Sequence, residues 1–171
     1  MPSSLLTTSR TQVDLITLDD ASFFVELMNS PGWLAFIGDR NIHDADSAEQ
    51  VIRDTYLRAY DEKGYGYYVI RERTGCEPMG ICGFLQRDGL KHVDFGFAVL
   101  PQVQGQGLAY EACSAVLTYG ATTFGFVTLD AITKKSNHRS IRLLEKLNFT
   151  YAGDIILQAE PLRLYQWSAH R

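Results

Sequence analysis

The hexapeptide Gln104-Gly105-Gln106-Gly107-Leu108-Ala109 has the residue types and the spacing of an anion-binding loop. A predicted strand precedes it, and a predicted helix begins within it at Leu108. Glycines allow consecutive backbone N–H groups to converge because they carry no Cβ. The helix start adds unpaired N–H groups and the positive end of the helix dipole. The hexapeptide therefore predicts a phosphate site that needs no Lys or Arg, although a tight strand-to-helix turn would use the same glycines.

A second polar segment, Asn137-His138-Arg139-Ser140, begins another predicted helix. Asn137 and Ser140 are three residues apart at this helix start. In one interpretation Asn137 is an N-cap and Ser140 is a polar residue of the first turn. In the other interpretation, both side chains contact a ligand, and the segment alone does not choose between the two.

Two nucleotide-binding alternatives use similar glycines. A Walker loop requires Gly-Lys followed by Ser or Thr, and no such sequence follows Gly107. A dinucleotide fingerprint begins correctly with Gly105 and Gly107, and Asp130 lies about twenty residues further on. However, Tyr110 occupies the third glycine position, where close helix packing leaves no room for a side chain. The antiparallel strands expected before the loop also disfavour a doubly wound fold.

Apolar periodicity predicts the elements that position these two segments. Strands are expected near residues 13–16, 67–73, 79–86, 93–100, 126–133, 149–157 and 162–167. Helices are expected near 17–29, from Asp44 or Asp46 to Gly64, over 108–124 and over 137–147. Three consecutive strands with short turns indicate an antiparallel meander, whereas the later strand–helix–strand unit should be parallel. The order predicts an α+β fold: a mixed, mostly antiparallel twisted sheet of six to seven strands with helices on both faces.

Local signals define several element ends. Thr17 offers a hydroxyl cap with the Asp20 carboxylate three residues on, which predicts a helix start. Asp88-Gly89 predicts a hairpin turn, and Asn148 lies where a helix end requires positive φ. The segment Trp33–Arg40 shows no clear period and is expected to be a packed loop.

Composition indicates one globular domain over residues 1–171, because 46% of the residues are apolar and 21% are charged. The formal net charge of −4 makes nucleic acid a poor partner, since no basic excess exists to neutralise phosphates. No apolar run suits a signal peptide or a membrane span, so no membrane partner is expected. Three cysteines without CxxC spacing and four scattered histidines predict a reducing, cytoplasmic location and no metal site.

Three segments, in order, resemble the GNAT N-acetyltransferases. Gln104-x-x-Gly107-x-Ala109 resembles the acetyl-CoA pyrophosphate loop of that family. Asp94-Phe95-Gly96-Phe97-Ala98-Val99-Leu100-Pro101 is similar to the strand before the loop. Residues 137–149 resemble the family's Asn-x-x-Ser followed by Leu-Glu-Lys-x-Gly-Phe, with Asn148 in place of the glycine. The element order agrees over nearly the whole chain, and the resemblance is closest to the ribosomal-protein N-terminal acetyltransferases.

The resemblance implies acetyl-CoA as co-substrate, and a fold in which two parallel strands splay apart to admit it. The splayed strands would be 93–100 and 126–133. The pantetheine arm would pair with the backbone of Phe97-Ala98-Val99 as an added strand does, and the pyrophosphate would lie on the N–H groups of 104–109. Asn137 would hydrogen-bond the pantetheine side, and Ser140 would lie near the thioester sulfur.

The implied reaction is direct attack of a neutral amine on the thioester carbonyl, with coenzyme A leaving as a thiolate. Ser140 would donate to that sulfur, since Leu144 occupies the position where many members carry a tyrosine acid. A backbone N–H of residues 97–99 would meet the oxyanion. Asp94 would accept the amine's proton through water, although its position favours an ordinary carboxylate at a strand end. Leu144 also keeps open a non-catalytic acyl-CoA-binding protein.

The implied acceptor is a primary amine, either a protein N-terminus or a small molecule. The aromatic residues that could form the walls of the acceptor pocket are Trp33, Phe36, Tyr65 and Tyr67. The alternative is that each of them packs in the core or behind the pocket wall. Glu111, in the first turns of the loop helix, is expected to complement the helix dipole rather than to take part in catalysis. Either a monomer or a homodimer agrees with the resemblance.

Overall fold

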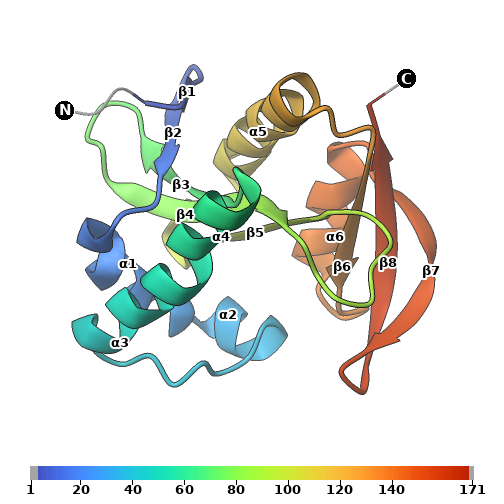
Figure 1. Ribbon diagram of the computed structural model, residues 1–171, viewed down its shortest axis with the longest axis horizontal. Helices are drawn as coiled ribbons and strands as arrows, with labels where there is room; N and C mark the ends of the chain where they lie inside the picture. The colour runs from blue at the N-terminus through green and yellow to red at the C-terminus, as the bar shows by residue number, and fades with distance from the viewer. Residues whose placement is uncertain (1–3, 170–171) are drawn as a thin grey trace.

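The computed structural model describes residues 4–169 and shows one sheet with helices on both of its faces (Figure 1). Its strands are β1 (Leu6–Thr7), β2 (Thr11–Leu15), β3 (Tyr67–Glu72), β4 (Pro78–Leu85), β5 (Asp94–Val99), β6 (Thr128–Thr133), β7 (Thr150–Leu157) and β8 (Glu160–Ser168). Its α-helices are α1 (Ala21–Met28), α2 (Pro31–Phe36), α3 (Ala45–Val51), α4 (Arg58–Lys63), α5 (Leu108–Phe124) and α6 (His138–Lys146). A π-helical segment, Ile52–Leu57, joins α3 to α4, and short 3₁₀ segments cover Leu18–Asp20 and Pro101–Val103. No helix within residues 4–169 is both long enough and apolar enough to cross a membrane.

The strands lie in the order β1-β2-β3-β4-β5-β6-β8-β7, and only the central neighbours β5 and β6 run parallel. Between these two strands, a single pair of described residues is in register, Asp94 with Asp130. The Asp130 N–H donates to the Val93 carbonyl at 2.9 Å, immediately before the strands part. The far edge of β5 still pairs with β4, so its near edge is open toward β6. The splayed parallel pair that the family resemblance implied is therefore present.

Two hydrophobic cores lie on opposite faces of the sheet. Side chains alternate along β3, so that Tyr68 and Ile70 belong to the core under α5 and α6, whereas Val69 belongs to the core under α1 to α3. Val116 of α5 and Phe24 of α1 are fully buried, one in each core. Packing on both faces fixes the strands that carry the candidate site residues.

Local sequence signals predicted several element ends. Thr17 forms a capping box with Asp20 before α1. Asp44, rather than Asp46, caps α3. The helix α5 has the predicted bounds, and Asn148 has a φ of 70° after α6. These ends were predictable because each depends on side chains a few residues apart.

Two expectations about the fold differ from the structure. The packed loop predicted over Trp33–Arg40 is wrong for its first half, because α2 covers Pro31–Phe36. The Pro31-Gly32 pair indicates the end of a helix, but proline is also favoured at the first helical position, where its missing N–H needs no partner. The described sheet has eight strands rather than six to seven. The additional strand, β1, has two residues and is too short to show a period.

Candidate active site

A cleft of about 1020 Å³ lies between the diverging ends of β5 and β6. One wall consists of β5 and the loop before α5, and the other of the end of β6 and the start of α6. Residues of α2, the π-helical segment, β3, β4 and the β7–β8 hairpin also line it. The cleft therefore joins the predicted phosphate loop to aromatic residues from the N-terminal half of the chain.

The glycine loop has the backbone geometry of an anion site. Gly105 and Gly107 have φ values of 76° and 79°, a left-handed conformation that glycine adopts without a steric penalty. Gly107 immediately precedes α5. Within residues 4–169, the N–H groups of Leu108, Ala109 and Tyr110 have no backbone acceptor. A helix start leaves such donors free for an anion, so the loop fits a phosphate group.

The residues of the predicted loop have two roles. Those that line the cleft are Gln104, Gly105, Gly107 and Ala109. Gln106 and Leu108 are not part of the lining. The Gln106 side chain donates to the Gln102 carbonyl at 2.9 Å, and Leu108 packs against the core under α5 and α6. Their side chains hold the loop, which leaves only their backbone groups for a ligand.

The N-terminal hairpin holds the loop through Arg10. The Arg10 guanidinium donates from Nη1 to the Gln106 carbonyl at 2.9 Å and from Nε to Glu111 at 2.8 Å. Glu111 also accepts from the Arg10 N–H at 2.7 Å and from Thr8 Oγ1 at 2.6 Å. Burial alone would raise the pKa of Glu111, but these hydrogen bonds hold it below its usual value. The Glu111 carboxylate is therefore occupied in anchoring the loop helix to the N-terminal hairpin.

The open edge of β5 forms the middle of the cleft. Phe97, Ala98 and Val99 all line it. The opposite edge of β5 pairs with β4, so that Val99 of β5 lies opposite Gly80 of β4. Beyond Asp94, no described residue of β6 is in register with β5. An extended ligand can add to such an edge as a further strand does.

The start of α6 faces this edge. Asn137 Oδ1 accepts from the Ser140 N–H at 3.2 Å, which confirms the N-cap interpretation. Both residues also line the cleft, where the Asn137 amide nitrogen and the Ser140 hydroxyl are available to a ligand. Arg139 donates to Gln104 Oε1 at 2.6 Å and so links α6 to the glycine loop. Leu144 is buried on the same wall and carries no proton donor.

Asp94 is a buried carboxylate on the cleft wall, with a side chain that is 3% exposed. Its Oδ2 accepts from Arg87 Nε at 3.1 Å, whereas its buried Oδ1 has no partner. Burial raises the pKa of Asp94 to about 7 against the opposing charge of Arg87, and Asp130 adds to the increase. A carboxylate with an unpartnered oxygen and a pKa near neutrality is suited to take a proton from an amine.

Aromatic side chains surround the other end of the cleft. Of the four aromatic residues predicted there, Trp33, Phe36 and Tyr67 line the cleft. Tyr65 does not, because it packs against Phe124 and Phe126, with 5.6 and 5.1 Å between the ring centroids. The Trp33 indole nitrogen is buried without a hydrogen-bond partner. These aromatic walls are therefore largely apolar, with one unused donor at Trp33.

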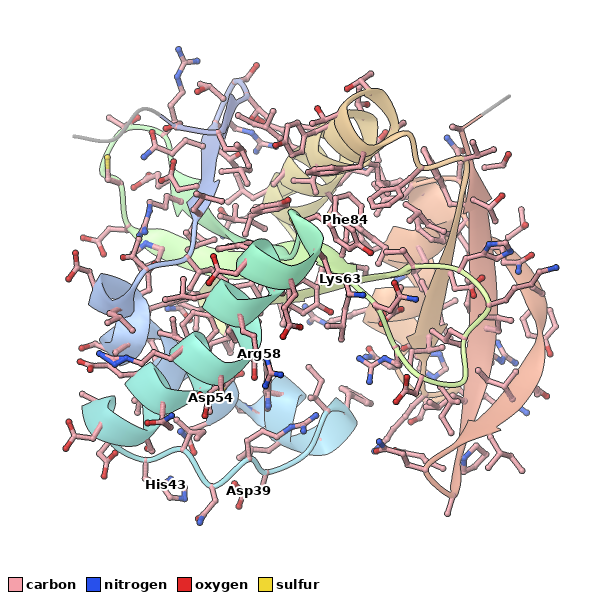
Figure 2. The ribbon with its side chains drawn as sticks, viewed as in Figure 1. Asp39, His43, Asp54, Arg58, Lys63 and Phe84 are labelled. Carbon is pink, nitrogen blue, oxygen red and sulfur yellow. The ribbon has the colours of Figure 1, made fainter. Side chains whose placement is uncertain are left out.

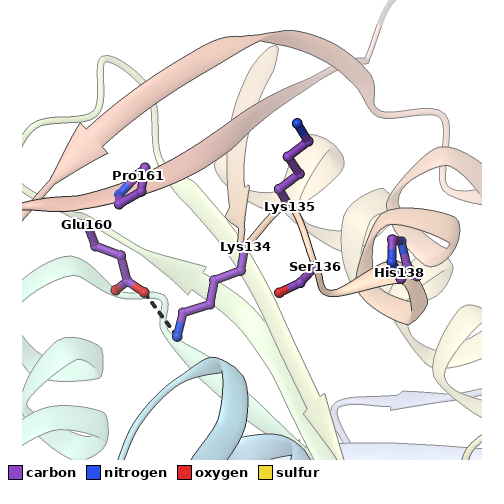
Figure 3. A pocket seen from close by; sticks show the side chains of 6 residues that line it. All are labelled: Lys134, Lys135, Ser136, His138, Glu160 and Pro161. Atoms are coloured by element: carbon purple, nitrogen blue, oxygen red, sulfur yellow. Dashed lines mark ion pairs between the residues drawn. The ribbon is translucent and has the colours of Figure 1, made fainter.

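A smaller hollow of about 550 Å³ adjoins the cleft at the loop between β6 and α6 (Figure 3). It is lined by Lys134, Lys135, Ser136, His138, Glu160 and Pro161. Lys134 and Glu160 form an ion pair of 3.0 Å and also line the main cleft. In the part of the chain that the structure describes, no three His, Cys, Asp or Glu side chains gather as metal ligands.

Comparison with known proteins shows which family combines these features. The acetyltransferase (GNAT) domain model matches residues 10–150. The chain belongs to the GNAT acetyltransferase family. Over 151 residues this GNAT chain is 28% identical to the uncharacterized N-acetyltransferase YoaA of Bacillus subtilis. The match covers 87% of this chain and 84% of YoaA. A shorter match, 30% identical over 66 residues, is to the spermidine N(1)-acetyltransferase of Escherichia coli K12 and covers 39% of this chain and 36% of that enzyme.

Solved structures share the GNAT fold at low sequence identity. The ribosomal-protein-S5-alanine acetyltransferase of Vibrio fischeri has a TM-score of 0.80 at 14% identity and covers 96% of both chains. RimL, a ribosomal L7/L12 alpha-N-protein acetyltransferase in complex with coenzyme A, has a TM-score of 0.82 at 15% identity. That match covers 97% of this chain and 98% of RimL. These likenesses establish the fold of this N-acetyltransferase and leave its acceptor open.

The sequence did not indicate several cationic side chains that make contacts around the cleft, among them Arg10, Arg87, Lys134 and Arg139. Arg87 lies seven residues before Asp94, across a predicted hairpin, and that spacing is a signal that could have identified the pair. Arg10, Lys134 and Arg139 each bind a residue that is distant in the sequence, so no local pattern indicates them.

Proposed function

We propose that the chain transfers the acetyl group of acetyl-CoA to a primary amine by direct attack of the amine on the thioester. One observation carries the proposal: unpaired N–H groups at the start of α5, the open edge of β5 and the buried Asp94 carboxylate all border a single cleft. Anion-binding donors at one end and a proton acceptor at the other are what acyl transfer from a phosphate-bearing carrier to an amine requires.

In this proposal the backbone binds most of the co-substrate. The N–H groups of residues 105–109 hold the pyrophosphate, whereas the predicted Gln104 N–H is already bonded to the Pro101 carbonyl at 3.2 Å. The dipole of α5 favours the pyrophosphate charge despite a net charge of −4 on the chain. The edge of Phe97–Val99 pairs with the pantetheine arm, and the Asn137 amide nitrogen donates to it. Acetyl-CoA supplies the acetyl group already activated as a thioester.

Side chains carry the proton transfers. With a pKa of about 7, Asp94 is partly deprotonated at neutral pH and accepts the proton that the amine must lose, directly or through water. Arg87 binds one oxygen of Asp94 and leaves Oδ1 for this proton. Ser140 donates to the sulfur as coenzyme A leaves, and a backbone N–H of β5 stabilises the oxyanion.

The acceptor in this proposal is the amine of a protein N-terminus or of a small molecule. The shared fold with two ribosomal-protein acetyltransferases supports the protein N-terminus. The partial sequence match to a spermidine acetyltransferase supports a small amine. The proposal includes a cytoplasmic location, because three cysteines without a pairing pattern suit a reducing compartment.

Thermal unfolding with acetyl-CoA, coenzyme A and NAD tests the co-substrate. A ligand that binds only the folded state at 100 times its Kd adds about 2.7 kcal/mol to the free energy of unfolding. We expect a higher Tm with acetyl-CoA and no change with NAD. An unchanged Tm with acetyl-CoA contradicts the proposal.

Release of the coenzyme A thiol with a panel of peptide, polyamine and amino-acid amines tests the reaction. Turnover of at least one class is expected. Binding of acetyl-CoA without turnover of any amine supports the second candidate, a non-catalytic acyl-CoA-binding protein. Leu144 favours that candidate, because its buried side chain has no hydroxyl at the position where many family members carry a tyrosine acid.

A further inference from the structure

A single lysine bridges the walls of the cleft beside α2, the helix that carries the candidate acceptor-pocket residues Trp33 and Phe36. The Lys134 ammonium lies 3.0 Å from Glu160 Oε1 and 3.2 Å from the Ala35 carbonyl (Figure 3). Ala35 belongs to α2, Lys134 directly follows β6, and Glu160 begins β8. Three segments that are distant in sequence are therefore joined at one side chain.

The same ion pair separates two spaces. Lys134 and Glu160 line both the cleft of about 1020 Å³ and the hollow of about 550 Å³. The other residues of the hollow, which are Lys135, Ser136, His138 and Pro161, do not line the cleft. The two side chains thus lie where the cleft and the hollow adjoin and form a partition between them.

This partition is held only weakly. The Lys134 and Glu160 side chains are 32% and 47% exposed. Exposed ion pairs contribute little to stability, because water screens them and both side chains lose rotational freedom. The backbone on both sides is fixed, since Thr133 pairs with Arg163 and Leu157 pairs with Glu160. The pair can therefore part by side-chain rotation while the sheet stays intact.

We propose that Lys134 is a specificity-determining residue that limits the length of the amine acceptor. Bound to Glu160 and to the Ala35 carbonyl, it closes the acceptor end and favours amines that fit within the cleft. Without this side chain, the cleft is continuous with the hollow, and an acceptor with a longer chain behind its nitrogen extends into it. The inference rests on the proposed acetyl transfer.

Acceptors that differ mainly in length test this proposal. Two such pairs are alaninamide with a hexapeptide beginning in alanine, and 1,4-diaminobutane with spermidine. The readout is the ratio of kcat/KM for the longer acceptor to that for the shorter one, in whichever pair the wild type acetylates. Lys134→Ala should raise this ratio about tenfold, the size of effect that a change in fit at a binding pocket produces. Lys134→Arg should keep the wild-type ratio, because a guanidinium can donate to both partners.

Arg58→Ala is the matched control. It removes another exposed ion pair, Arg58 with Glu62 at 2.7 Å on α4, outside the cleft lining (Figure 2). An unchanged ratio in Lys134→Ala, or an equal rise in Arg58→Ala, overturns the proposal and leaves the acetyl transfer standing. A parallel fall of kcat/KM for both acceptors indicates a purely structural role and also overturns it. If the wild type acetylates no amine, the proposed function itself is wrong, and this inference is wrong with it.

Discussion

At the end of the cleft where we propose that the phosphates bind, the groups available to a ligand are backbone N–H groups of residues 105–110. Elsewhere in the cleft, where we propose that the amine binds, they are side chains such as Trp33, Asp94 and Lys134, which come from three separate segments. A site made of backbone recognises charge and shape, and most substitutions outside its glycines leave it unchanged. A site made of side chains changes with every substitution. We infer that the two ends separate the shared task, holding the acetyl donor, from the individual one, choosing the amine.

The largest effect is expected at the end built from side chains. Asp94→Asn should lower kcat by about 10³-fold, the usual range for a lost general base, with little change in acetyl-CoA affinity. The kcat/KM of the wild type should rise with pH through about 7, since only deprotonated Asp94 accepts a proton. A variant that keeps this limb of the pH–rate profile would remove Asp94 from the reaction.

The same variant has a second readout in stability. The folded-state pKa of Asp94 is raised from 3.8 to about 7, so between these values the folded state binds more protons than the unfolded state. The free energy of unfolding therefore falls as pH rises through this window. Asparagine resembles the neutral acid, so Asp94→Asn should have a higher Tm than the wild type near pH 8 and no advantage near pH 4. A lower Tm near pH 8 would contradict the raised pKa.

At the backbone end, Gly107→Val should weaken acetyl-CoA binding by about 100-fold, measured by calorimetry. Valine is strained at a φ of 79°, and its Cβ would lie 3.2 Å from Arg10 Nη2. Gly125→Val is the matched control, because Gly125 has a φ of 71° in open space at the other end of α5. The control should lower the Tm but leave the affinity unchanged. Equal affinities in the two variants would refute the loop assignment.

Ser140→Ala tests the boundary between the two ends and should have a smaller effect. We expect about a tenfold loss of turnover, because one hydrogen-bond donor to developing charge is removed, with acetyl-CoA binding retained. Ser136→Ala is the comparison, since Ser136 lines only the outer hollow. Wild-type turnover in both variants would exclude Ser140 from the mechanism.

Arg10→Ala should have the smallest effect, because it acts on the loop from outside the cleft. Its pair with Glu111 is half exposed, and such pairs contribute ~0.7 kcal/mol, which is about threefold in affinity. We expect a higher KM for acetyl-CoA at unchanged kcat. Arg53→Ala, which removes another exposed pair, should leave both constants unchanged. A fall in kcat with Arg10→Ala would show that the loop also affects the chemistry.

The same division explains what the sequence could predict. The bounds of α5 and the glycine loop were predictable, because glycine conformations and the helix start depend on neighbouring residues. The N-cap role of Asn137 was also predictable, since its partner is three residues away. The helix α2 was missed because its first proline also suits a helix end. The Lys134–Glu160 pair and the position of Tyr65 were not predictable, because both depend on how distant strands pack.

Among residues 4–169, Asp94 and Asp130 form the one registered pair between β5 and β6, so the sheet consists of two half-sheets joined at a single point. β1 to β5 form one half and β6 to β8 form the other. An extended ligand along the open edge of β5 would supply the hydrogen bonds that a continuous sheet has at this position. Amide hydrogens of residues 95–99 that face the cleft would then exchange more slowly with solvent. Binding would convert a hinged sheet into a stiffer one, and hydrogen exchange would measure that change in elasticity even where no atom moves far.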